Sequence, residues 1–119
     1  MKKVFPLLLF VLLAFAGCQR GPATYEFSQN PRQISINAEK FVNQVEKKSK
    51  HYSAEDWDVA IDEFVHMCKN YVEFANQLTQ DEQMKYDNAR VKFMHAIDVN
   101  GTEEMAKRVK EEYSKMMGN

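Results

Sequence analysis

The sequence predicts an all-α fold, a small antiparallel three- to four-helix bundle over residues 35–119. Apolar residues recur at three- and four-residue spacing through most of this stretch, which is the period of a helix with one buried face. The 119 residues include only 3 prolines and 4 glycines, which favours helices over a turn-rich β fold. A hydrophobic content of 45% suits one packed domain rather than a disordered chain.

The first predicted helix covers about residues 37–50. Its apolar face combines five residues at helical spacing: Ile34, Ala38, Phe41, Val42 and Val45. The helix ends in the lysines Lys47, Lys48 and Lys50, whose positive charge suits the negative end of a helix dipole.

The second helix has the clearest start signal in the chain. Ser53 and Asp56 have the spacing of a capping box, in which each side chain binds the backbone N–H of the other residue. Tyr52 and Trp57 flank this cap at the positions of a hydrophobic staple. A wide apolar stripe follows: Trp57, Ala60, Ile61, Phe64, Val65, Cys68, Tyr71, Val72, Ala75 and Leu78.

A second capping box, Thr79 with Glu82, comes directly after this stripe. We expect the chain to turn there into an antiparallel hairpin, because a cap inside a continuous helix would have no free N–H groups to bind. The third helix is predicted over about residues 80–98 and stops at Asn100-Gly101. Thr102 is the expected cap of a fourth helix.

The N-terminal residues have the pattern of an export signal. Lys2 and Lys3 precede an uncharged run from Val4 to Gly17, which is shorter than the roughly 20 residues that span a membrane. The run ends in Phe15-Ala16-Gly17-Cys18, which resembles the lipobox of bacterial lipoproteins. The resemblance implies that residues 1–17 are a lipoprotein signal peptide and that Cys18 carries a diacylglyceryl lipid anchor.

An alternative processing site lies beside this one. Ala14-Phe15-Ala16 fits the pattern of ordinary signal cleavage, which would release a soluble protein. With cleavage before Cys18, residues 18–34 would form a flexible tether, since Gly21-Pro22 and Asn30-Pro31 interrupt regular structure. Because Gln19 rather than Asp follows Cys18, the lipoprotein resemblance implies the outer membrane.

Composition and motifs give no sign of catalysis. Loss of Lys2 and Lys3 lowers the net charge from −1 to −3, so neither nucleic acid nor anionic lipid is an expected electrostatic partner. No phosphate-binding loop, nucleophile motif or zinc spacing occurs, and His51, His66 and His95 lack the spacing of metal ligands. Cys68 lies on the apolar stripe of the second helix. We expect no enzymatic activity, no cofactor, no metal and no small-molecule substrate.

Methionine is frequent for so short a chain. Most of these residues are expected to fill the core, but flexible methionines also occur on protein-binding surfaces. The candidates for such a surface are Met67, Met84, Met94 and Met116.

Two groups of envelope proteins resemble parts of the chain. The capped Ser53–Trp57 start and the later Leu78–Gln83 segment resemble small helical lipoproteins of Bacteroidota, which implies a helical envelope protein but no activity. Leu78-Thr79-Gln80-Asp81-Glu82 is more weakly similar to the repeated motif of periplasmic chaperones related to Spy.

The expected function is therefore a non-enzymatic, lipid-anchored domain that binds another envelope protein. The alternative is a periplasmic chaperone or stress-response binder.

The lipid anchor predicts a specific mass. Membrane-extracted protein should have the mass of Cys18–Asn119 plus lipid, and Cys18→Ser should abolish that species. Intact-protein mass spectrometry of the two proteins checks this. An unmodified, soluble product beginning at Gly17 would contradict the anchor.

Overall fold

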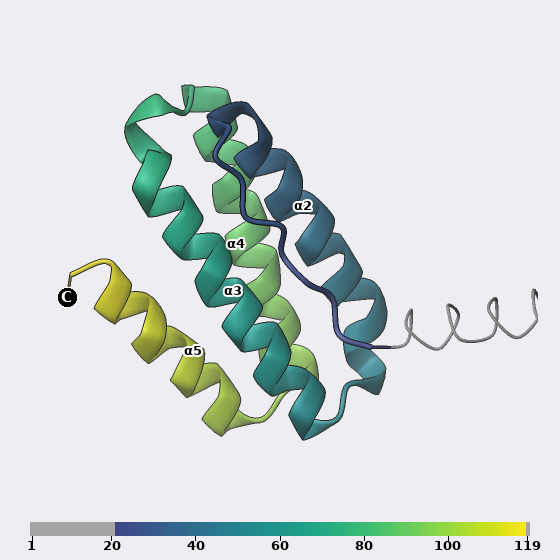
Figure 1. The fold of residues 1–119 in the computed structure, drawn as a ribbon. Coiled ribbons are helices and arrows are strands. Elements are labelled where there is room, and N and C mark those ends of the chain that lie inside the picture. The colour runs from purple at the N-terminus through teal and green to yellow at the C-terminus, as the bar shows by residue number, and fades with distance from the viewer. Residues whose placement is uncertain (1–20, 119) are drawn as a thin grey trace, which may run out of the picture.

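The structure is a computed structural model that describes residues 21–118. In this part of the chain four α-helices pack side by side, each antiparallel to the one before it (Figure 1). They are α2 (Pro31–Lys48), α3 (Ala54–Phe74), α4 (Gln80–Asn100) and α5 (Glu103–Met116). Short 3-10 turns, η1 (Ser49–His51) and η2 (Ala75–Gln77), follow α2 and α3. The all-α prediction is confirmed.

The predicted caps form as expected. The Ser53 hydroxyl accepts from the Asp56 backbone N–H at 3.1 Å, and the Asp56 carboxylate accepts from the Ser53 N–H at 3.0 Å. Thr79 and Glu82 make the same exchange at 3.1 and 2.8 Å, so the hairpin after Leu78 is confirmed. The Tyr52 and Trp57 rings meet edge to face, 5.2 Å apart, as the hydrophobic staple requires.

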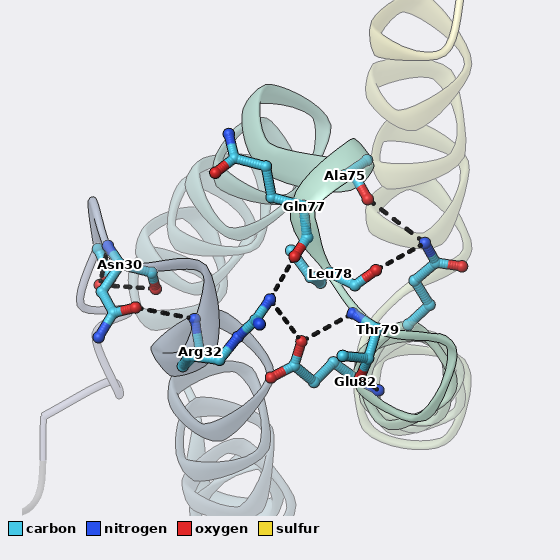
Figure 2. A network of polar contacts seen from close by, with 9 residues as sticks. Asn30, Arg32, Ala75, Gln77, Leu78, Thr79 and Glu82 are labelled. Atoms are coloured by element: carbon cyan, nitrogen blue, oxygen red, sulfur yellow. Dashed lines mark hydrogen bonds and ion pairs between the residues drawn. The ribbon is translucent and has the colours of Figure 1, made fainter.

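Polar contacts at both ends show that α2 and α4 run in the same direction. At their starts, the Arg32 guanidinium pairs with Glu82 at 2.9 Å and donates to the Gln77 carbonyl (Figure 2). At their ends, the Asn100 amide donates to the Ser49 hydroxyl at 2.9 Å. The two helices are therefore neighbours over their whole length, although α3 separates them in the sequence.

Flat aromatic rings fill the space between α3 and α4. Phe64 stacks on Phe93 with ring centroids 4.3 Å apart, and Tyr71 stacks on Tyr86 at 4.0 Å. Phe93 also meets Phe41 of α2 and Trp57 of α3, at 5.9 and 6.3 Å. One fully buried ring of α4 thus contacts both of the other long helices, α2 and α3.

The last helix packs on the bundle. Val109 of α5 is fully buried, and Arg108 pairs with Asp58 and Asp62 of α3 at 2.9 and 3.2 Å. The preceding turn needs a glycine for space, since a Cβ at Gly101 would lie 2.8 Å from the Ile97 carbonyl oxygen.

The segment before α2 differs from the tether predicted over residues 18–34. Helix α2 begins at Pro31, with Asn30 as its cap, rather than near residue 37. Residues 21–30, here called the N-terminal strap, run extended along α2 and α3 (Figure 1). Ala23 and Tyr25 of the strap are buried. Periodicity could not reveal this packing, because side chains of distant helices bind the main chain of the strap.

Asn70 of α3 makes the central contact with the strap. Its buried side-chain oxygen accepts from the Tyr25 hydroxyl at 2.6 Å and from the Ser28 N–H at 2.9 Å. Its amide nitrogen donates to the Ser28 carbonyl at 2.9 Å. Since one side chain satisfies both main-chain groups of Ser28, the strap needs no strand partner there.

Within residues 21–118, none of the helices has the length and apolar character that crossing a bilayer requires. The proposed signal peptide and Cys18 lie outside the described residues.

Replacing Asn70 tests the contribution of the strap to stability. Asn70→Ala should lower the free energy of unfolding by about 2–4 kcal/mol, because it removes three hydrogen bonds and leaves buried polar groups without partners. Urea unfolding followed by fluorescence of Trp57, the single tryptophan, measures the change. Asn43→Ala, on the exposed side of α2, is the control and should shift stability by less than about 0.5 kcal/mol. Equal effects of the two variants would contradict the role of Asn70.

Candidate interaction surface

The residues with catalytic or metal-binding potential are dispersed. His51 lies on η1, His66 on α3 and His95 on α4, and each is exposed. Among residues 21–118, no three His, Cys, Asp or Glu side chains lie close enough together to hold a metal ion. A hollow of about 950 Å³ beside α5 is lined by exposed charges of both signs, including Glu103, Lys107 and Glu111. Such an open, mixed surface offers no convergent set of groups for catalysis.

Cys68 is part of the core. Its side chain is 1% exposed, and burial raises the pKa of the Cys68 thiol to about 11. The Tyr86 hydroxyl, which donates to the sulfur, only partly offsets this rise. The thiol is therefore protonated at neutral pH, and it lacks the thiolate character that a nucleophile or redox sensor requires.

The four candidate methionines do not form one surface, which corrects the sequence-based hypothesis. Met67 is fully buried, so it cannot meet a partner in the folded protein. Met94 and Met116 are half-buried and pack against the core. Of the four candidates, only Met84 is an exposed residue, at 59% exposure. Methionine content alone could not separate the two roles, because a methionine fills a core as readily as it covers a surface.

Helix α4 carries apolar residues on two opposite faces. Its inner face buries five residues at helical spacing: Tyr86, Ala89, Phe93, Ala96 and Ile97. Its outer face leaves Met84, Val91 and Val99 between 53% and 63% exposed. The exposed polar residues Asn88 and His95 lie between them. We name these five residues the α4 stripe.

The spacing of the α4 stripe is that of a seam between two helices. Its members follow one another at intervals of three or four residues. Since each residue of an α-helix is rotated by about 100° from the one before it, all five lie within one narrow sector of the surface of α4. The stripe runs for roughly 22 Å along the axis, at 1.5 Å per residue. Lys85 and Lys92 flank one side of it, and Asp87 and Asp98 flank the other.

The stability of the isolated bundle does not explain the α4 stripe. Exposed valine is a poorer helix former than a straight polar side chain, because its branched Cβ restricts rotation. Other large exposed apolar residues, such as Ile36, Val59 and Val72, lie on different helices. Only Met84 of the stripe was a candidate from the sequence. Met84, Val91 and Val99 follow one another at seven- and eight-residue steps along the third predicted helix. This second apolar row was a sequence signal that could have revealed Val91 and Val99.

Alkaline pH should destabilise the fold. In the unfolded chain the Cys68 thiol ionises near pH 8.5, whereas in the folded protein it keeps its proton to about pH 11. Burial also raises the pKa of the Tyr25 and Tyr86 hydroxyls. The unfolded state therefore binds fewer protons above pH 9, and the free energy of unfolding falls by up to about 1.4 kcal/mol per pH unit for each group.

Urea unfolding at a series of pH values measures this loss. The free energy of unfolding should stay level from pH 7 to 8.5 and then decline, with a smaller slope between pH 8.5 and 10 in Cys68→Ala, which lacks the thiol. An identical slope in both proteins would show that Cys68 does not titrate as its burial requires.

Comparison of the chain with protein-family models, with curated proteins and with solved structures finds no match. The α4 stripe is therefore the feature from which a function can be inferred.

Proposed function

We propose that this protein is a lipid-anchored component of the bacterial envelope, in the outer membrane, that binds another envelope protein without catalysis. The observation that carries the proposal is the α4 stripe, an exposed row with three large apolar residues on a helix whose opposite face already fills the core. Apolar patches rimmed by polar residues occur at surfaces that contact other proteins.

The partner that fits the stripe is an amphipathic helix. Its apolar seam would lie along Met84, Val91 and Val99, with side chains at the same three- and four-residue spacing. Acidic residues on one edge would meet Lys85 and Lys92, and basic residues on the other edge would meet Asp87 and Asp98.

Charge favours such a partner over an antiparallel second copy. Two antiparallel copies of α4 paired about the middle of the stripe would place Lys92 opposite Lys92 and Asp87 opposite Asp98. A partner helix with complementary edges avoids this repulsion.

The size of the stripe explains why a membrane anchor would be useful. A strip about 22 Å long and 10 Å wide gives roughly 200 Å² per partner, well below the ~800 Å² of a typical stable interface. Binding in free solution should therefore be weak. Attachment of both proteins to one membrane would raise their effective concentration and favour the complex.

Photo-crosslinking in intact cells tests the stripe. A photoreactive amino acid at Asn88, in the middle of the stripe, should give one discrete adduct with a second protein. The triple variant Met84→Gln, Val91→Gln, Val99→Gln should reduce that adduct at least tenfold. The matched control changes three exposed apolar residues on other helices, Ile36→Gln, Val59→Gln, Val72→Gln, and should leave the adduct unchanged.

Three other results would contradict the proposal. An adduct of twice the protein's own mass would identify a second copy as the occupant. A broad smear that is insensitive to the stripe variant and increases with unfolded clients would favour the chaperone alternative. Equal adducts from Asn88 and from the exposed Asn43 of α2 would show that the contact is not specific.

A further inference from the structure

The N-terminal strap is fixed to the bundle along its length. Near its start, the Ala23 N–H donates to the Tyr52 hydroxyl at 3.1 Å. In its middle, the Tyr25 N–H donates to Glu63 at 2.6 Å, and the Asn37 amide donates to the Glu26 carbonyl at 2.9 Å. Together with the Asn70 contacts, these bonds join the strap to both α2 and α3.

These contacts determine where the chain leaves the bundle. Tyr52 lies just before α3, so Ala23 is held at the end formed by η1, the start of α3 and the α4–α5 turn (Figure 1). Ser49 and Asn100 meet at this same end. The opposite end is closed by Arg32, Gln77 and Glu82, where α2 and α4 begin (Figure 2).

The strap leaves little chain between the bundle and Cys18. Four residues lie between Cys18 and Ala23, so the two are five residue steps apart and at most about 17 Å from each other when the chain is extended. If the strap were not docked, the free chain from Cys18 to Pro31 would span at most about 45 Å. Since α4 is itself about 31 Å long, only the docked strap keeps one end of the bundle nearer to Cys18 than the other.

We propose that the docked strap orients the bundle on the membrane, with the η1 end facing the lipid headgroups and the Arg32–Glu82 end pointing away. This inference rests on the lipid at Cys18 in the proposed function. In this orientation the α4 stripe rises from the membrane, with Val99 nearest the lipid and Met84 roughly 22 Å farther out. The partner is then a helix that stands upright beside the bundle.

Charge does not supply the orientation. The η1 end carries Lys47, Lys48 and Lys50, but also Glu55, Asp56, Glu103 and Glu104. Opposite charges at one end give no net attraction to a lipid surface of either sign. The orientation should therefore persist on neutral lipid and in high salt, where the Debye length is about 3 Å at 1 M.

Energy transfer to the membrane measures the orientation. The full-length lipidated protein carries Cys68→Ala and a single dye-labelled cysteine, either His51→Cys at the η1 end or Asp81→Cys at the opposite end. Lipid modification leaves Cys18 without a free thiol. On phosphatidylcholine vesicles with an acceptor dye on the headgroups, transfer should be clearly greater from position 51 than from position 81, at low salt and at 1 M salt alike.

Two changes should reduce the difference between the labels. A 15-residue Gly-Ser insertion between Arg20 and Gly21 lengthens the chain outside the strap and should abolish the difference. Asn70→Ala removes the three hydrogen bonds to Tyr25 and Ser28, which weakens the docking of the strap and should lower the difference. Asn43→Ala is its control and should keep the difference.

The outcomes separate the two proposals. A lipidated protein with equal transfer from both labels overturns the orientation alone. A difference that survives both the insertion and Asn70→Ala shows that the strap is not its cause, and overturns the inference too. Protein without lipid on Cys18, found by mass spectrometry, overturns the anchor and the orientation together.

Discussion

Burial of the Phe93 ring is the interaction on which the rest of the bundle depends. This ring lies against Phe41 of α2 and against Trp57 and Phe64 of α3, so one side chain of α4 connects three helices. Burying a side chain of this size stabilises the fold by about 1.5–3 kcal/mol, and aromatic pairs add roughly 0.5–1.5 kcal/mol each. In a bundle of fewer than 100 described residues, each large buried side chain supplies a substantial share of the core.

The same packing explains the two-faced character of α4. Helices α2 and α3 meet its inner face and α5 reaches only its flank, so none of the helices within residues 21–118 covers its outer face. The exposed Met84, Val91 and Val99 lie on this face, and the partner helix that we propose would cover them. Its contact area would be small, so confinement of both proteins on one membrane would favour the complex.

The strap links the fold to the proposed anchor. Main-chain groups of the strap form hydrogen bonds with the side chain of Tyr52 and with side chains of α2 and α3. Because the strap contributes its main chain to these bonds, they depend little on its sequence. Tyr25 is the exception, since its ring packs edge to face on Phe41 and its hydroxyl reaches Asn70. A segment attached in this way transmits the position of a membrane anchor to the whole domain.

The sequence by itself determined the starts of three helices, because caps and periodicity are local: Ser53, Thr79 and Thr102 each start a helix where their spacing predicts it. The start of α2 at Pro31 was not predicted. It also identified most of the buried faces. Only the tertiary structure decided that α2 and α4 are neighbours, that residues 21–30 pack on the bundle, and that Met67 is buried while Val91 and Val99 are exposed. These features depend on contacts such as that between Asn70 and Ser28, 42 residues apart, which no local pattern encodes.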